Sequence, residues 1–273
     1  MIPPMVSRGL NLRPVKQVIL RAGKSRRAGQ VFQRLSGASG IFESIDEARE
    51  AVRRHRADTC GHLDGNLIGS NFTLSSTIRM SDYPVLFWLQ EAIRTEKLSV
   101  FDFGGGVGQT YVNFSHLLPE DRLERWIVQD LPDVISQAST RFFLDGVPPR
   151  LVFTDRMAAG STCNVALAAG ALHYWEGSMS AFLDAMGTRP AHFMVNRSPM
   201  RARGKAFFTV QQGRDWAVPC QVRSVEQVTA EMEAEGYTLV DSWTDLEKSL
   251  NLPLFPDYSC PYRGLYYQRL EDS

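Results

Sequence analysis

The chain alternates short apolar runs with amphipathic segments from about residue 41 to its end. Short apolar runs predict buried strands, and apolar residues spaced three and four positions apart predict helices that cover those strands. Such alternation is typical of an α/β domain with a mostly parallel sheet. Seven runs are predicted to be strands: residues 98–103, 126–129, 150–154, 164–169, 192–196, 237–243 and 264–269.

Capping residues mark the ends of several predicted helices. Ser178 can cap a helix that Gly187 would end, because a serine hydroxyl accepts from the first backbone N–H groups and glycine adopts the left-handed conformation of a helix end. Ser224 and Gln227 have the spacing of a capping box, and Pro132 suits a first helical turn. One large domain of this kind fits a chain of 273 residues.

Charge is distributed unevenly along the chain. Eight of the 30 basic residues and none of the 30 acidic residues precede Glu43, so the remainder has 22 basic and 30 acidic side chains. We therefore expect three parts: a basic, flexible leader over residues 1–40, a helical cap segment over 41–97 and a core over 98–273. The leader is predicted to be a solvated extension. A targeting peptide, a nucleic-acid arm and a weak membrane-surface contact are the alternatives.

Composition excludes several classes of protein. With 44% hydrophobic and 22% charged residues the chain is predicted to fold as a globular protein, and no apolar run approaches the roughly 18 residues of a membrane span. The four cysteines are far apart, which fits a reducing cytoplasm better than a disulfide scaffold. His55, Cys60, His62 and Asp64 are close in sequence but lack the usual ligand spacing, so no metal site is predicted.

A glycine-rich turn follows the first strong strand. Asp102 ends that strand, and Gly104, Gly105, Gly106 and Gly108 form the turn before a helical pattern begins. Ligands of open α/β sheets bind outside the carboxyl ends of the strands, and glycines there let the backbone approach a ligand that a Cβ would exclude. The turn is therefore predicted to line a ligand site.

The identity of the ligand depends on spacing and charge. A dinucleotide-binding loop has the pattern G-x-G-x-x-G, but Gln109 occupies the last glycine position when the count starts at Gly104. A carboxylate at Asp102 would also repel a phosphate, by roughly 4 kcal/mol at 4 Å in an effective dielectric constant of about 20. S-adenosylmethionine instead offers a sulfonium and an ammonium group. The sequence therefore favours S-adenosylmethionine over a dinucleotide.

Two further carboxylates follow the next strands. Asp130 ends the second strand, where a carboxylate can accept from both ribose hydroxyls, and Leu131 beside it is predicted to line the same site. A role of Asp130 in capping the following helix is the alternative. Asp155 follows the third strand and is predicted to reach the adenine amino group.

These residues together resemble the class I S-adenosylmethionine-dependent methyltransferases. The run from Val100 to Gly108 looks like their first motif, Asp130-Leu131-Pro132 is similar to the D-L-P segment of small-molecule O-methyltransferases, and 168–175 looks like the segment after their fourth strand. A closer resemblance is to methyltransferases often encoded among bacterial surface-polysaccharide genes. The resemblance implies a Rossmann-like, mostly parallel seven-stranded sheet with helices on both faces, and methyl transfer to a small molecule or glycan precursor, at oxygen.

The resemblance also points to the acceptor side. His173 is the candidate general base, because it follows the fourth strand and an imidazole titrates near neutrality; a histidine that is structural or that only orients the substrate is the alternative. Tyr174 beside it is predicted to contact the acceptor. Arg197 and Arg201 follow the fifth strand and would suit an anionic acceptor; a solvated loop without a ligand is the alternative. Trp216 belongs to an aromatic C-terminal third that could stack on a ring or pack in the core.

Three other functions share some of these features. A nicotinamide-dependent oxidoreductase could use the same fold, and a binding protein could keep the pocket without transferring a methyl group. A nucleic-acid methyltransferase is suggested only by the basic leader, and we expect no stable complex with nucleic acid. The oligomeric state has no signal in the sequence.

Overall fold

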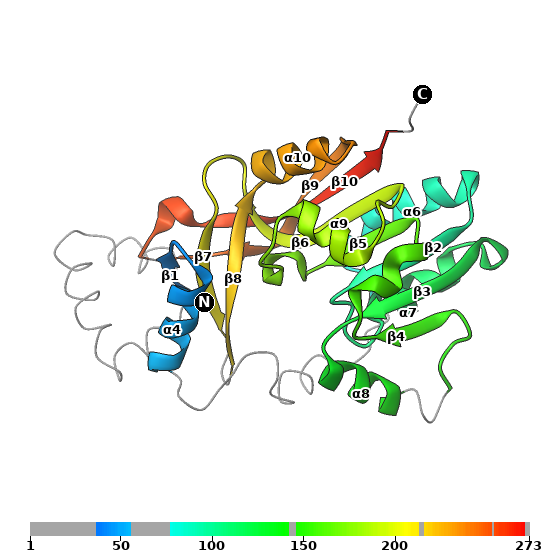
Figure 1. The fold of residues 1–273 in the computed structure, drawn as a ribbon, viewed down its shortest axis with the longest axis horizontal. Coiled ribbons are helices and arrows are strands. Elements are labelled where there is room, and N and C mark those ends of the chain that lie inside the picture. Colours follow the sequence, from blue (N-terminus) through cyan, green and yellow to red (C-terminus); the bar gives the residue numbers. More distant parts are fainter. Residues whose placement is uncertain (1–36, 56–76, 142–145, 213–215, 253, 271–273) are drawn as a thin grey trace.

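A seven-stranded sheet forms the centre of the computed structural model, which describes residues 37–55, 77–141, 146–212, 216–252 and 254–270. Its strands run parallel except β10, which is antiparallel to both of its neighbours. In spatial order the strands are β4 (Leu151–Thr154), β3 (Leu123–Gln129), β2 (Leu98–Phe103), β5 (Val165–Ala169), β6 (His192–Arg201), β10 (Cys260–Arg269) and β9 (Tyr237–Leu250). This order and these directions confirm the predicted fold of the class I methyltransferase type (Figure 1).

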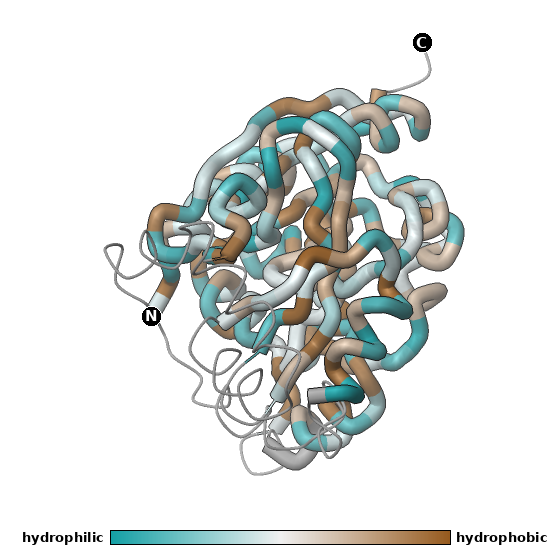
Figure 2. Tube along the Cα trace, turned by 90° about the vertical axis from the view of Figure 1, so that its left-hand side faces the viewer, coloured by the Kyte–Doolittle hydropathy of each residue, from teal (hydrophilic) through white to brown (hydrophobic). Residues whose placement is uncertain are grey.

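Helices cover both faces of this sheet. On one face α6 (Tyr83–Thr95) and α7 (Gln109–Phe114) pack against side chains such as Val100, and on the other α9 (Met179–Met186) and α10 (Val225–Ala234) pack against side chains such as Phe101. Neighbouring residues of β2 thus belong to two different cores, because successive strand side chains point to opposite faces. The hydrophobic stretches of the tube run mainly through the interior of the fold (Figure 2).

The predicted helix ends are found in the structure. The Ser178 hydroxyl accepts from the Ala181 backbone N–H at 3.1 Å, and Gly187 ends α9 with a φ of +78°. The Ser224 hydroxyl accepts from the Gln227 backbone N–H at 3.1 Å at the start of α10. Short 3-10 turns complete the main domain: η2 (Met80–Asp82), η3 (Ser115–Leu117), η4 (Glu120–Arg122), η5 (Met157–Thr162), η6 (Leu172–Tyr174) and η7 (Pro256–Tyr258).

A second, three-stranded antiparallel sheet was not predicted from the sequence. It consists of β1 (Ala38–Phe42), β7 (Phe207–Gln212) and β8 (Ala217–Ser224), with α4 (Ile45–His55) packed against it. This small sheet joins the main one where the long strand β6 pairs with β8, Met200 with Arg223 and Arg201 with Ser224. It lies on the left of Figure 1, away from β2, β3 and β4.

The segment predicted as a helical cap, residues 41–97, is divided between two places. α4 packs on the small sheet, whereas α6 buries Leu89 and Ile93 in the core of the main sheet. α8 (Pro132–Arg141) starts at Pro132, as expected, and contacts β4. Most of the basic leader, residues 1–36, lies outside the described residues.

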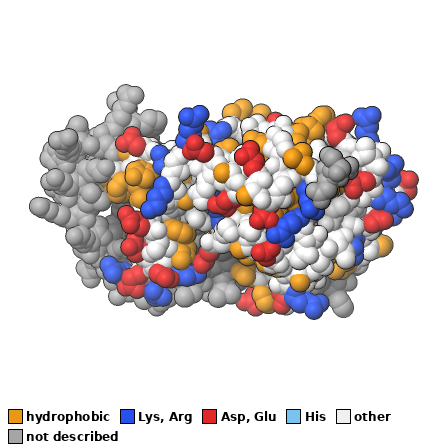
Figure 3. Space-filling model, turned by 45° about the horizontal axis from the view of Figure 1, so that its top comes forward, with side chains coloured by type: hydrophobic (Ala, Val, Ile, Leu, Met, Phe, Trp, Pro, Cys, Tyr) orange, Lys and Arg blue, Asp and Glu red, His pale blue; other side chains and the backbone are white. Residues whose placement is uncertain are grey.

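Charged side chains of both signs are interspersed on the molecular surface drawn in Figure 3, where blue and red groups alternate without a continuous field of one sign. Among the described residues, no helix is long and apolar enough to cross a membrane.

Candidate functional site

The glycine turn between β2 and α7 is held in a conformation that requires glycine. Gly104, Gly106 and Gly108 have φ values of +63°, +61° and +78°, a region that other L-residues rarely adopt. The Gly104 N–H donates to the Gln129 carbonyl at 2.7 Å, and the Gly108 N–H donates to the Gly105 carbonyl at 3.0 Å. The turn is thereby fixed to the carboxyl end of β3.

A cavity of about 710 Å³ opens beside this turn, and we call it the central cavity. Its volume lies in the usual range for small-molecule sites, about 300–1,000 Å³. It reaches from the glycine turn and the start of α8 to η6, β9 and the small sheet. Its described lining residues are Arg49, Phe103, Gly104, Gly106, Val107, Gln129, Asp130, Leu131, Val134, Gly170, Ala171, Tyr174, Glu176, Gln211, Trp216, Val218, Pro219 and Lys248.

Asp130 presents a carboxylate in the wall of the central cavity, next to the turn. Its Oδ2 accepts from the Gly106 N–H at 2.8 Å and its Oδ1 from the Leu131 N–H at 2.8 Å. Burial raises the pKa of Asp130, and the two backbone hydrogen bonds oppose that shift. The structure thus brings together Asp130, Leu131 and the glycine turn, as the sequence predicted.

Asp102 was expected to face the ligand, but its carboxyl group lies beneath the glycine turn. It is fully buried beneath the turn, where a Cβ on Gly105 would come within 2.7 Å of its carboxylate. The Trp126 indole N–H donates to its Oδ2 at 3.0 Å. Burial raises the pKa of Asp102 to about 7, against the opposing effects of that hydrogen bond and of the Arg197 charge.

This placement corrects the expectation that an ionised Asp102 faces the ligand and repels phosphate. The carboxyl group is not part of the cavity wall, and with a pKa of about 7 it is only partly ionised at neutral pH. Asp102 supports the turn from below, and its direct contact with a cofactor stays a prediction. Asp155, also predicted to meet the cofactor, is exposed at the end of β4 and lies outside the lining.

The two residues predicted on the acceptor side, His173 and Tyr174, are separated by the structure. Tyr174 lines the central cavity and its hydroxyl donates to Gln211 Oε1 at 2.8 Å. His173 is 4% exposed and is not a lining residue; its ring lies 4.1 Å from the Tyr174 ring and 6.2 Å from the Tyr262 ring. The imidazole therefore packs behind Tyr174.

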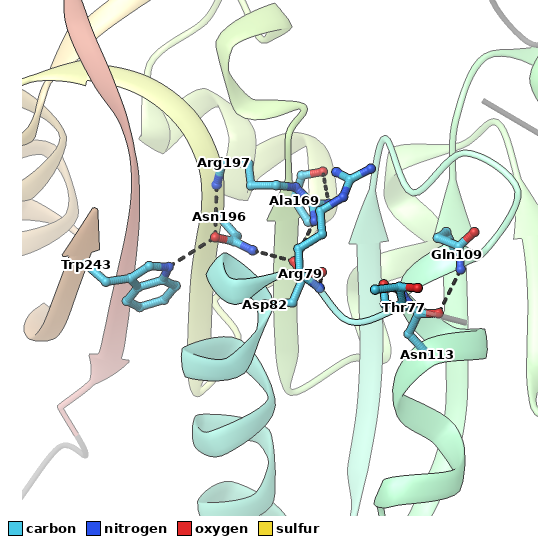
Figure 4. Close-up of polar contacts among 9 residues, drawn as sticks. All are labelled: Thr77, Arg79, Asp82, Gln109, Asn113, Ala169, Asn196, Arg197 and Trp243. Carbon is cyan, nitrogen blue, oxygen red and sulfur yellow. Dashed lines mark hydrogen bonds and ion pairs between the residues drawn. The ribbon is translucent and has the colours of Figure 1, made fainter. Parts of the chain in front are cut away.

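Arg197 belongs to a buried polar network rather than to the cavity wall (Figure 4). Its Nη1 lies 2.5 Å from Asp82 Oδ1, and Asn196 Nδ2 donates to the same oxygen at 3.0 Å. Trp243 Nε1 donates to Asn196 Oδ1 at 3.1 Å, and the Arg79 N–H donates to Asp82 Oδ2 at 3.3 Å. We call these five residues the Asp82 network. It ties the start of α6 to the middle of β6.

Arg197 is unusual within this network in both its backbone conformation and its pKa. Arg197 is the one non-glycine residue with a positive φ, +51°, in the described part of the chain. Burial lowers the pKa of Arg197, while the charge of Asp82 opposes that shift. Arg201, the other predicted acceptor ligand, lies at the end of β6 with its guanidinium 5.3 Å from the Tyr258 ring centroid, and it too is not a lining residue.

Other lining residues had no motif to identify them. Gln211, Val218 and Pro219 come from strands that the sequence did not predict, and Trp216 precedes one of them. Lys248 lies on the part of β9 beyond residue 243, where the predicted strand ended. These positions required knowledge of how the small sheet docks on the main one.

Metal-ligating residues do not cluster in the described ranges, where no three His, Cys, Asp or Glu residues could hold an ion. Cys60, His62 and Asp64 lie outside those ranges, and so does the side chain of His55.

Gly104→Ala is expected to destabilise the protein more than Gly106→Ala. Both glycines have nearly the same positive φ, so each alanine carries a conformational cost of about 1–2 kcal/mol. A Cβ at position 104 would also lie 2.3 Å from the Ala171 Cβ, whereas one at position 106 would meet no atom within 4 Å. Urea unfolding of both variants measures the difference. Adding Ala171→Gly to Gly104→Ala should remove the excess; equal losses in the two single variants would contradict the proposed contact.

No protein-family model matches the chain, and no curated protein sequence matches it. Solved structures similar to the chain include the 1,6-didemethyltoxoflavin-N1-methyltransferase of Burkholderia thailandensis, with 15% identity and a TM-score of 0.47 over 85% of this chain and 93% of that one. Magnesium protoporphyrin IX methyltransferase of Synechocystis PCC 6803 has 12% identity and a TM-score of 0.49 over 80% and 90% of the two chains. An S-adenosylmethionine-dependent methyltransferase of Clostridium acetobutylicum has 13% identity and a TM-score of 0.43 over 77% and 97%. The assignment of the fold rests on the strand order and directions described above.

Proposed function

We propose that the protein binds S-adenosylmethionine beside the glycine turn and transfers its methyl group to an oxygen of a small-molecule or glycan-precursor acceptor. One observation carries this proposal: the glycine turn of β2 and the carboxylate at the end of β3 line the same cavity, in a sheet with a single antiparallel strand. Ligands of open α/β sheets bind at that edge. The glycan-precursor part comes only from the sequence resemblance.

The described residues fit this cofactor. The left-handed turn exposes Gly106, at which an added Cβ would meet no protein atom within 4 Å, so backbone lines the cavity there. Asp130 can accept hydrogen bonds from the ribose hydroxyls, and Leu131 and Val134 supply apolar wall beside it. When bound, S-adenosylmethionine would supply a methyl group on a sulfonium. The protein's own contribution is to position the acceptor next to it and to exclude water.

A nicotinamide dinucleotide is the rival ligand on the same fold. Asp102 lies buried outside the cavity lining, which weakens the charge argument against a phosphate, so the exclusion now depends mainly on the spacing of the turn. The glycines at 104, 106 and 108 do not follow G-x-G-x-x-G. A direct comparison of the two ligands is therefore the decisive test.

We assign the acceptor to the part of the cavity that Tyr174 lines. Burial raises the pKa of Tyr174 well above its usual value, which keeps the phenol protonated and donating to Gln211, so that its oxygen can still accept a hydrogen bond from an acceptor. His173 packs against Tyr174 without reaching the lining. This favours the alternative in which His173 orients the substrate indirectly, by positioning Tyr174, over direct deprotonation of the acceptor.

Isothermal titration of the full chain is expected to show binding of S-adenosylhomocysteine and none of NADH. Asp130→Asn should weaken S-adenosylhomocysteine binding by about 10–100-fold, because hydrogen bonds to a charged group contribute about 1.5–3 kcal/mol. Asp155→Asn is the matched control, since this carboxylate lies outside the cavity lining. Binding of NADH, or equal effects of the two variants, would contradict the proposed cofactor site. Cofactor binding without methyl transfer to any acceptor would instead support a binding protein that has no transferase activity.

A further inference from the structure

We propose that Lys248 recognises an anionic group, a carboxylate or a phosphate, on an acceptor whose remaining body is apolar or ring-shaped. That the anion belongs to the methyl acceptor rests on the proposed function, whereas the anion site itself is defined by the cavity. Lys248 replaces Arg197 and Arg201 as the predicted contacts of an anionic substrate, since neither of them reaches the cavity wall.

Lys248 is an exposed residue of β9 whose side chain reaches a ring of the neighbouring strand β10. Its Nζ lies 4.4 Å from the centroid of the Tyr262 ring, in a cation–π contact. The Tyr262 hydroxyl accepts from Gln211 Nε2 at 2.8 Å, and Gln211 Oε1 accepts from the Tyr174 hydroxyl at 2.8 Å. Lys248, Gln211 and Tyr174 all line the central cavity. The ammonium group therefore belongs to a chain of ordered side chains in the cavity wall.

The other charges of the cavity wall have partners or a separate role. Arg49 Nη2 and Glu176 Oε1 form an ion pair at 2.5 Å, and Asp130 is held by backbone N–H groups beside the glycine turn. In the described part of the chain, no Asp or Glu oxygen lies within 4 Å of the Lys248 ammonium. Lys248 is thus a lining cation that an incoming anion can pair with.

The surrounding field favours such an anion. Burial lowers the pKa of Lys248, and the positive charges of Arg197 and Arg79 lower it further, whereas Asp245 acts in the opposite direction. Lys248 is nevertheless an exposed residue, so solvent offsets part of this shift, and its ammonium is available to an anion because the residue lines the cavity. A carboxylate or phosphate next to Nζ would provide negative charge there.

The wall next to Lys248 indicates the rest of the acceptor. Trp216, Val218 and Pro219 contribute an aromatic face and two apolar side chains from the small sheet. Ligand sites of this kind combine a mostly apolar wall with a few placed polar groups that set orientation. An acceptor with one anionic group and an apolar or ring-shaped body matches this wall, whereas an uncharged polyhydroxylated sugar leaves Lys248 without a counter-charge.

The test uses three small probes titrated into the full chain: 4-hydroxybenzoate, phenyl phosphate and the neutral 4-hydroxybenzamide. At least one of the two anions should bind at least about 10-fold more tightly than the amide, as expected for a charge-assisted hydrogen bond. Lys248→Met and Lys248→Gln should each remove that preference, and Lys248→Arg should retain it. Lys97→Met, an exposed lysine away from the cavity, should change nothing. Thermal unfolding of each variant shows that it is folded.

The outcomes separate this inference from the proposed function. A preference for benzoate alone identifies a carboxylate acceptor, and a preference for phenyl phosphate alone identifies a phosphorylated one. Equal binding of anions and amide, no binding of either anion, or an anion preference that survives both neutral variants would overturn the role of Lys248. Titrations are run with and without S-adenosylhomocysteine, so failure of the cofactor site is read independently of the anion site.

Discussion

Asp82→Ala is expected to lower the free energy of unfolding by about 3–5 kcal/mol, the usual effect of leaving one member of a buried ion pair without its partner. Asp82 is 6% exposed, and its carboxylate accepts from Arg197, Asn196 and the Arg79 backbone. Its removal leaves a buried guanidinium that burial already disfavours, as the lowered pKa of Arg197 indicates. Urea unfolding monitored by tryptophan fluorescence and circular dichroism gives the change.

Two further variants show whether burial is the cause. Arg197→Met in the Asp82→Ala background should restore part of the loss, because the unpaired charge is then absent, and a double-mutant cycle yields the coupling. Glu176→Ala breaks an ion pair of the same 2.5 Å separation in which both side chains are more than 40% exposed. That loss should stay below about 1 kcal/mol. Similar losses in Asp82→Ala and Glu176→Ala would contradict the assigned role of the Asp82 network.

Asp102→Asn is expected to remove a pH dependence from the stability of the protein. The folded-state pKa of Asp102, about 7, exceeds its ordinary value of 3.8, so between these two pH values the folded state holds a proton that the unfolded state has lost. The free energy of unfolding of the wild type therefore falls as pH rises through this window. Integrated over the shift, the fall amounts to roughly 4 kcal/mol.

Stability profiles of the two proteins from about pH 4 to about pH 8 measure this effect. The variant should gain relative to the wild type as pH rises, on top of a constant offset, since an asparagine oxygen can still accept from the Trp126 indole but its amide needs partners of its own. Asp155→Asn, at an exposed site, is the control and should leave the slope unchanged. Parallel profiles for wild type and Asp102→Asn would show that Asp102 is ionised in the folded state.

The main sheet could be predicted from the sequence because its signals are local. Most of the seven strands contain a short apolar run, and the glycine turn, Ser178 and Pro132 mark the neighbouring turns and helix starts. The turn and Asp130 could also be placed together, since the carboxyl ends of parallel strands share one edge of a sheet. The lengths of several strands differed, as β3, β6, β9 and β10 are longer than predicted.

The small sheet lacked such signals. Pro199 interrupts the run that continues β6, and Pro219 does the same in β8, and proline inside a run argues against a strand. The sequence pattern ends the fifth strand at residue 196 and places Arg197 and Arg201 beyond it, at the ligand edge, whereas in the structure β6 continues through both residues. Arg197 also has a left-handed φ inside that strand, which no sequence pattern indicates.

The partners of charged residues are the other part that sequence could not supply. Asp82 precedes Arg197 by 115 positions, and no pattern along the chain connects them. Likewise Asp102 was placed correctly before the turn, but its burial depends on Trp126 and on the turn that covers it. Contacts that form only when distant elements pack decide whether a charge faces a ligand.

The small sheet pairs with the main sheet at two positions, between the end of β6 and the end of β8, and packs against β9 and β10 in a shared hydrophobic cluster. Its β8 and the residue before that strand provide three of the apolar or aromatic lining positions, 216, 218 and 219. The glycine turn and Asp130 belong to other strands. The acceptor side of the cavity can therefore be changed separately from the cofactor side. Replacing the β7–β8 hairpin by one of different shape would alter the apolar lining residues, while β2 and β3, which carry the turn and Asp130, keep their sequence.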